Sequence, residues 1–268
     1  MNASEFDSWM RAELDTVERA LQRWVPPGAP AGLGEAMRYG VLDGGKRLRP
    51  LLVMAACEAA NGDRSAALRA GVAVELIHAY SLIHDDMPCM DNDVLRRGKP
   101  TVHVKFGEAQ AMLAGDAMQA LAFEVLTPAA ADADGIAPLL QARLCGLLAR
   151  AAGHEGMAGG QAIDLASIGL PLNEEQLRDM HRRKTGALLQ ASVLMGAALR
   201  RVAAPRPGRR CRCTARRSAW RFRWSTTSSM SRRRRRRWAR PPARTSTSTN
   251  PPMCRCSASK APSDRRKL

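Results

Sequence analysis

The sequence of residues 74–101 is Val-Glu-Leu-Ile-His-Ala-Tyr-Ser-Leu-Ile-His-Asp-Asp-Met-Pro-Cys-Met-Asp-Asn-Asp-Val-Leu-Arg-Arg-Gly-Lys-Pro-Thr. It starts as an apolar helical run that carries His78, and it continues into four closely spaced carboxylates and two arginines. These six residues are Asp85, Asp86, Asp91, Asp93, Arg96 and Arg97. Carboxylates this close repel one another unless a cation lies among them, and Mg²⁺ commonly bridges a few carboxylates to substrate phosphates. Because arginine grips phosphate oxygens in bidentate fashion, the stretch predicts a metal-bound diphosphate site rather than a solvated acidic helix end.

Helical periodicity extends outward from this stretch in both directions. The sequence predicts helices over 4–24, 33–42, 51–60, 65–86, 108–126, 136–152, 156–164 and 173–199. The helix at 65–86 is apolar on most faces, which predicts a central position. Gly115 predicts a close approach by another group, and the small residues of 156–164 predict a tight helix crossing. Strand signals are nearly absent, so the predicted fold class is all-α.

The spacing around the acidic cluster predicts how its members meet. His78 and Asp85 are seven residues apart, which is two helical turns, so both can face the same way. Pro88 ends or kinks the helix, and the residues at 87–90 let the chain turn back. We therefore expect Asp91 to return to the side of Asp85.

Two weaker patterns also suit a diphosphate. Lys46, Arg47 and Arg49 follow a Gly-Gly turn, and glycines let the backbone approach a phosphate while basic side chains supply charge. Alone, such a turn is more often plain surface. Lys184-Thr185-Gly186 lies inside a predicted helix and suggests a break that exposes backbone carbonyls.

Charge divides the 268 residues into two parts. The net charge is +17, but residues 205–268 hold 21 of the 42 Lys and Arg and a single acid, Asp264, for a net of +20. Residues 1–204 therefore carry a net of −3 and form the predicted helical domain, while 205–268 is predicted to be a disordered basic tail. That tail also offers a rival function, non-specific binding to nucleic-acid backbones, with tryptophans able to stack on bases.

The sequence gives no export or membrane signal. The N-terminal residues show no basic region followed by an apolar run, and no stretch of about 18 uninterrupted apolar residues occurs. We expect no membrane span and a cytoplasmic location.

Several ordered motifs resemble the class I trans-polyprenyl diphosphate synthases, and most closely the bacterial farnesyl diphosphate synthases. They are residues 44–50 (Gly-Gly-Lys-Arg-Leu-Arg-Pro), 82–91, 93–101, 115–117, 159–164 (Gly-Gly-Gln-Ala-Ile-Asp) and 184–186. The resemblance covers about residues 1–203. It implies the isoprenoid synthase helical bundle and Mg²⁺-dependent transfer from an allylic diphosphate to isopentenyl diphosphate. It also implies a homodimer.

The resemblance assigns roles residue by residue. Asp85 and Asp91 would bind Mg²⁺, with Asp86 in support. Isopentenyl diphosphate would be held by Lys46, Arg49, His78 and Arg97. Arg96 would hold the allylic diphosphate, and Lys184 and Thr185 would stabilise the allylic cation and its diphosphate.

Product length is the finest inference. The four-residue gap between Asp86 and Asp91, and the bulky Tyr80 five positions before Asp85, are similar to the short-chain members. Tyr80 would stop the growing tail at fifteen carbons, with ten- and twenty-carbon products as alternatives. A terpene cyclase shares the fold and an Asp-rich motif, but it needs no isopentenyl site, so Lys46, Arg49 and His78 count against it.

The family's second Asp-rich motif is missing from the printed tail, and a frame shift explains both this absence and the odd composition. Suppose that each true codon joins the last base of one present codon to the first two bases of the next. Residues 219–225 then allow Gly-Leu-Ala-Phe-Gln-Val-Val, 226–230 allow Asp-Asp-Ile-Leu-Asp, and 238–245 allow Leu-Gly-Lys-Thr-Ala-Gly-Lys-Asp. Trp238 has one codon, so the glycine after that leucine is forced. We therefore expect the chain to be out of frame from about 204–208 onward, with little activity as printed.

Overall fold

The computed structural model describes residues 2–42, 44–129 and 135–200, which all belong to one unit, Met1–Phe222. The predicted boundary at 204, the basic tail at 205–268 and its frame-shift interpretation lie outside the described residues.

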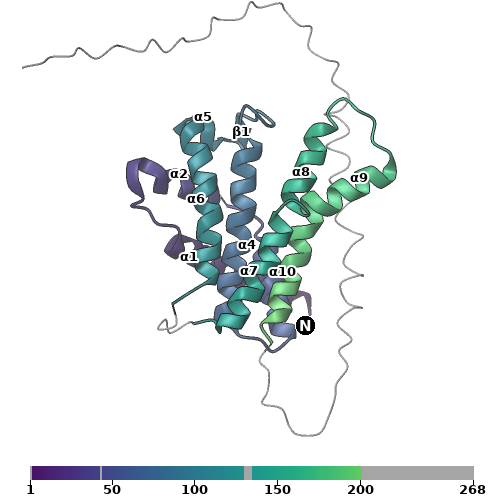
Figure 1. The fold of residues 1–268 in the computed structure, drawn as a ribbon. Coiled ribbons are helices and arrows are strands. Elements are labelled where there is room, and N and C mark those ends of the chain that lie inside the picture. Colours follow the sequence, from purple (N-terminus) through teal and green to yellow (C-terminus); the bar gives the residue numbers. More distant parts are fainter. Residues whose placement is uncertain (1, 43, 130–134, 201–268) are drawn as a thin grey trace, which may run out of the picture. The chain divides into compact units, whose positions relative to one another are not determined.

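Helices make up most of the described part of the chain (Figure 1). They are α1 (Ala3–Trp24), α2 (Leu33–Val41), α3 (Leu48–Ala59), α4 (Arg64–Asp85), α5 (Val102–Phe106), α6 (Glu108–Leu126), α7 (Pro138–Ala152), α8 (Met157–Ala166), α9 (Glu174–His181) and α10 (Ala187–Ala198). A 3₁₀ turn, η1 (Pro30–Gly32), precedes α2, and a π-helical turn, η2 (Arg182–Gly186), joins α9 to α10. The all-α prediction is confirmed.

The sequence analysis missed two short elements between α4 and α6. Strands β1 (Leu95–Arg96) and β2 (Lys99–Pro100) form an antiparallel hairpin, and the five-residue α5 follows it. Two-residue strands are too short to show an alternating pattern.

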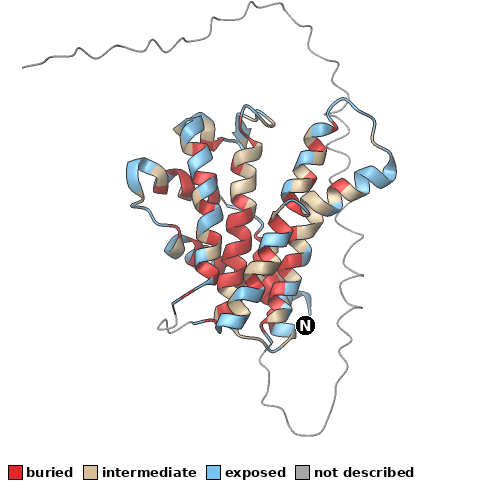
Figure 2. Ribbon diagram, viewed as in Figure 1, coloured by how far each residue is buried: buried red, intermediate tan, exposed pale blue. Residues whose placement is uncertain are grey.

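α4 is the central helix (Figure 2). It packs against α6, α3 and α10, and its buried residues occupy every face between Ala66 and Ile83. By length and composition α4 could cross a membrane, but 72% of its apolar window is buried inside the bundle. That burial is the mark of a core helix in a globular protein, and it delivers the acidic cluster at the helix C-terminus.

Glycines allow helices to cross closely at both positions that the sequence predicted. A Cβ on Gly115 of α6 would lie 2.0 Å from Nε2 of His84, and a Cβ on Gly160 of α8 would lie 2.1 Å from the backbone N of Lys184. Each glycine therefore fixes a contact next to the acidic cluster or the Lys184 turn.

Capping explains two helix starts. Asn173 and Gln176 form the predicted capping box of α9, with bonds of 3.0 and 2.9 Å. The expectation that Ser4 opens the first helix is wrong, because Asn2 caps α1 in a capping box with Glu5.

Candidate functional site

The acidic cluster lies where α4 ends, and the chain turns back there as predicted. The backbone N–H of Asp91 donates to the carbonyl of Asp85 at 2.9 Å, and that of Asp93 donates to the carbonyl of Asp86 at 3.1 Å. Residues 87–93 thus form a tight loop that returns Asp91 to the side of Asp85.

Asp85 is a carboxylate that lacks sufficient positive charge. Burial raises its pKa to about 6, and the neighbouring Asp91 and Asp86 raise it further, while Lys184 acts in the opposite direction. Nζ of Lys184 lies 3.7 Å from Oδ2 of Asp85. A cation at this position would restore the carboxylate to its ionised form.

Lys184 also links the acidic cluster to α8. Its Nζ donates to Oδ2 of Asp164 at 2.7 Å. Asp164 received no role in the sequence analysis, although it ends the 159–164 motif. The signal that could have found it is the tight crossing at Gly160, which places α8 directly on the backbone of Lys184.

The expected helix break at residues 184–186 is wrong. Lys184 and Thr185 lie in the π-helical turn η2, which continues the helix from α9 into α10. π-Helical turns recur at functional sites because the extra residue moves side chains off the regular helical positions.

Gln161 is a second residue that the sequence analysis missed. It lies next to Gly160, and within the described part of the chain both polar atoms of its amide are buried without a hydrogen-bond partner. A buried amide in this state favours a position completed by a ligand or water.

Asp86 and Arg96 form a pair in this structure. Nε and Nη2 of Arg96 donate to the two oxygens of Asp86 at 2.8 and 2.6 Å, and Asp86 is only 3% exposed. The hydrogen bond from Arg96 to Asp86 is the main cause that raises the pKa of Arg96. Asp86 is thereby committed to Arg96, which leaves Asp85 and Asp91 as the carboxylates for a metal.

The predicted basic residues converge on the other side of the cluster. A Cβ on Gly45 would lie 3.5 Å from both Nη atoms of Arg97, so the β1–β2 hairpin meets the turn at 44–49. Burial lowers the pKa of His78 to about 3, and four arginines add to the effect. In decreasing order they are Arg49, Arg97, Arg96 and Arg47. His78 is therefore a neutral imidazole in a strongly positive environment.

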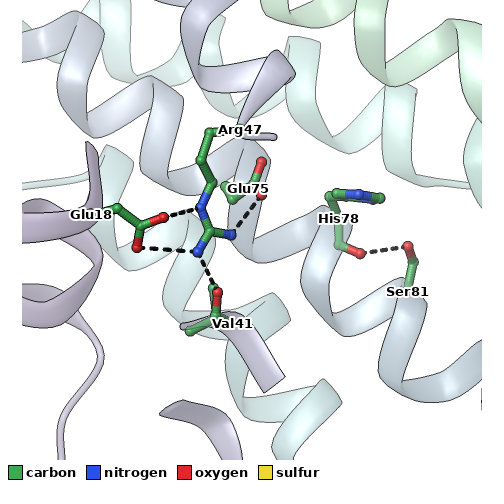
Figure 3. Close-up of polar contacts among 6 residues, drawn as sticks. All are labelled: Glu18, Val41, Arg47, Glu75, His78 and Ser81. Atoms are coloured by element: carbon green, nitrogen blue, oxygen red, sulfur yellow. Dashed lines mark hydrogen bonds and ion pairs between the residues drawn. The ribbon is translucent and has the colours of Figure 1, made fainter. Parts of the chain in front are cut away.

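Arg49 and Arg47 differ in their availability. Burial lowers the pKa of Arg49 while Glu75 opposes that shift, and Nε of Arg49 is buried without a hydrogen-bond partner among the described residues. Arg47 instead forms ion pairs with Glu18 and Glu75 (Figure 3). The expectation that all three basic residues of this turn supply charge to a phosphate is therefore wrong for Arg47.

The donors present fit Mg²⁺ when phosphates complete its coordination. Within the described ranges, no group of three or more His, Cys, Asp or Glu side chains is placed to hold a metal ion. Mg²⁺ is commonly held by one or two carboxylates plus substrate phosphates, and the raised pKa of Asp85 shows a carboxylate in need of a cation. Asp85 and Asp91 are the residues to hold it.

Comparison with known proteins agrees with this geometry. The profile of the family described as polyprenyl synthetase matches residues 30–213. The Arabidopsis thaliana protein named heterodimeric geranylgeranyl pyrophosphate synthase large subunit 1, chloroplastic, is 50% identical over 196 residues, which is 72% of this chain and 53% of that protein. The geranylgeranyl pyrophosphate synthase of Catharanthus roseus is 46% identical over 194 residues, 72% of this chain and 54% of its own length. The chain spans about half the length of these curated relatives.

Solved structures give the same result. An FPP/GFPP synthase from Zymomonas mobilis superposes with a TM-score of 0.68 at 48% identity and covers 74% of this chain and 72% of its own. A geranyltransferase from Legionella pneumophila superposes with a TM-score of 0.70 at 37% identity, over 76% and 72% of the two chains. The chain belongs to the polyprenyl synthetase family of class I trans-prenyl synthases, with the all-α isoprenoid synthase fold.

Proposed function

We propose that the helical domain performs prenyl transfer from dimethylallyl or geranyl diphosphate to isopentenyl diphosphate. The observation that carries this proposal is the meeting of two kinds of group at the end of α4. Asp85 lies 3.7 Å from Lys184 on one side, and the turn at 44–49 meets Arg97 on the other. One side suits a metal-bound leaving group and the other suits a second diphosphate.

The chemistry needs two diphosphates in different roles. The C–O bond of the allylic diphosphate breaks and its electrons leave with the diphosphate. The double bond of isopentenyl diphosphate then forms the new C–C bond, and a proton is lost to the departed diphosphate. Mg²⁺, when bound, supplies positive charge to the leaving diphosphate.

The chain's own residues hold and orient the reactants. Lys184 and Thr185 stabilise the allylic cation and its diphosphate, and Arg96 contacts that diphosphate with the N–H groups not used by Asp86. Lys46, Arg49, His78 and Arg97 hold isopentenyl diphosphate. Neutral His78 can donate one hydrogen bond without adding charge.

Binding measurements on isosteric variants test these assignments. We expect Asp85→Asn and Asp91→Asn to weaken the Mg²⁺-dependent binding of a non-hydrolysable geranyl thiolodiphosphate. In contrast, Lys46→Met and Arg49→Met should weaken the binding of isopentenyl diphosphate. Equal effects of all four substitutions on both ligands would contradict two separate diphosphate sites.

For the product we propose fifteen carbons. Tyr80 lies one turn before Asp85, and its ring meets that of His84 edge-to-face with centroids 5.6 Å apart, which supports a fixed bulky floor. The names of the relatives also make geranylgeranyl diphosphate a comparable alternative. Tyr80→Ala should lengthen the product if Tyr80 sets its length, as chromatography of the products would show.

We further propose that residues from about 204–208 onward are translated out of frame. Two family motifs are recovered in the same shifted frame and in their proper order, and the glycine after the position of Trp238 is forced. The proposed product is a prenyltransferase impaired in this chain, in the cytoplasm, and a homodimer when the frame is intact. Resequencing codons 200–210 tests the idea, and an uninterrupted frame there would show that the basic tail belongs to the protein.

A further inference from the structure

The three basic residues of the turn before α3 have different environments. Lys46 is exposed and Arg49 is partly buried, whereas Arg47 is only 4% exposed. Arg47 therefore lies inside the bundle, between the two residues that we assign to isopentenyl diphosphate.

Hydrogen bonds use most of the guanidinium of Arg47 (Figure 3). Nε donates to Oε1 of Glu18 at 2.7 Å and Nη1 donates to Oε1 of Glu75 at 2.9 Å. Nη2 donates to Oε2 of Glu18 at 3.2 Å and to the carbonyl of Val41 at 2.7 Å. Since arginine has five N–H groups, too few remain for a bidentate grip on a diphosphate.

These contacts join three helices to the start of a fourth. Glu18 belongs to α1, Val41 ends α2 and Glu75 belongs to α4. Arg47 itself is the residue before α3, and its φ of 44° is left-handed. A non-glycine residue keeps this backbone only when its surroundings impose it. The buried ion pairs impose it here, and they fix the point at which α3 begins.

Glu75 faces two arginines but is hydrogen-bonded to one. Its Oε1 accepts from Arg47, while its Oε2 and the Nε of Arg49 are both buried without a partner among the described residues. The charge of Glu75 acts on Arg49 against the effect of burial. If Arg47 were absent, Glu75 would be left as an unpaired buried carboxylate and would attract Arg49.

We propose that Arg47 is a positioning residue that fixes the turn at 44–49 and occupies Glu75, so that Arg49 stays available for the diphosphate of isopentenyl diphosphate. This role rests on the proposed function, in which Lys46 and Arg49 bind that substrate. It separates three adjacent basic residues into two that bind and one that holds them.

Calorimetric titration of the full chain with isopentenyl diphosphate tests the role. We expect Arg47→Met to bind at least about tenfold more weakly than wild type, because the positioning depends on charge-assisted hydrogen bonds. Adding Glu75→Gln to that variant should restore most of the affinity, since a neutral side chain no longer captures Arg49. Arg64→Met is the matched control. It removes an arginine that pairs with Glu13 at 2.7 Å at the opposite end of α4, and its binding should equal that of wild type.

Amide hydrogen exchange gives a readout of positioning that does not depend on the ligand. Arg47→Met should speed exchange in residues 44–49 and leave α6 unchanged. If this variant does not fold, Arg47→Lys decides, because one ammonium cannot reach both carboxylates and Val41 together and should weaken binding at least about threefold.

The outcomes separate the positioning role from the proposed function. Wild-type affinity in Arg47→Met, or in Arg47→Lys where that variant decides, overturns the role while the function stands. A double variant no better than Arg47→Met also overturns it. If wild type itself binds no isopentenyl diphosphate, the proposed function is contradicted and the role falls with it.

Discussion

At the scale of single residues, His78 gives the domain a defined pH dependence. Its pKa is about 3 in the folded protein against 6.5 for the ordinary side chain. Between these values the unfolded chain binds a proton that the folded chain does not. We therefore predict that the free energy of unfolding falls as the pH drops from 6.5 toward 3, by up to about 1.4 kcal/mol per pH unit. Urea denaturation at a series of pH values, without divalent cations, measures it.

The variant His78→Asn isolates this contribution. Asp85 acts in the opposite sense, because its raised pKa of about 6 makes the folded chain the better proton binder between pH 6 and 3.8. Wild type therefore shows the difference of the two effects, and Asp85→Asn should show the His78 effect alone. An equal pH slope in Asp85→Asn and in the double variant with His78→Asn would contradict the assignment.

A second prediction at this scale concerns Gly115. A Cβ there would overlap the ring of His84, whose Nε2 lies 3.1 Å from the carbonyl of Met112. We predict that Gly115→Ala lowers the free energy of unfolding by about 1–3 kcal/mol, as overpacking does in a tight core. Thermal or urea denaturation measures the loss.

Gly146→Ala is the control for this substitution. Gly146 lies in α7, where a Cβ would come no closer than 3.5 Å to the flexible side chain of Arg150. It should be neutral or stabilising because alanine is the better helix former. Equal destabilisation by both substitutions would show that the contact with His84 is not the cause.

At the scale of elements, the crossing of α8 over η2 holds Lys184 beside the acidic cluster. A Cβ on Gly160 would lie 2.1 Å from the backbone N of Lys184, so we predict that Gly160→Ala separates α8 from the π-helical turn. The expected result is a loss of stability of about 1–3 kcal/mol, together with weaker binding of a geranyl thiolodiphosphate in the presence of Mg²⁺.

Gly186→Ala tests whether the helix crossing is responsible. Gly186 lies in η2 itself, but a Cβ there would meet nothing closer than 3.7 Å. The substitution should therefore be tolerated in stability measurements. If Gly186→Ala proved as damaging as Gly160→Ala, the sensitivity would belong to the π-helical turn and not to the crossing.

The sequence predicted those elements whose signals are local. The apolar faces of 65–86, the capping residues Asn173 and Gln176, and the return of Asp91 all follow from nearby residues. The β1–β2 hairpin, the π-helical form of η2 and the pairing of Lys184 with Asp164 do not. They depend on contacts between segments that are distant in sequence, and for Arg47 such contacts reversed the expected role.

At the scale of the whole molecule, charge separates the helical domain from the tail. Residues 205–268 carry a net of +20 and residues 1–204 carry −3. We predict that the printed chain binds duplex DNA non-specifically, with an affinity that falls steeply as salt rises. Deleting residues 205–268 should abolish that binding and leave the affinity for isopentenyl diphosphate unchanged. Sequence-specific DNA binding that survives the deletion would favour a nucleic-acid function for the helical domain.

The central claim is that the helical domain is a prenyltransferase whose printed tail is out of frame. The most direct measurement is Mg²⁺-dependent turnover of geranyl and isopentenyl diphosphates, compared between the printed chain and one with the frame restored near codon 204. We predict farnesyl diphosphate from the restored chain and little or no product from the printed one. Near-normal turnover by the printed chain, or none by the restored chain, would contradict the account.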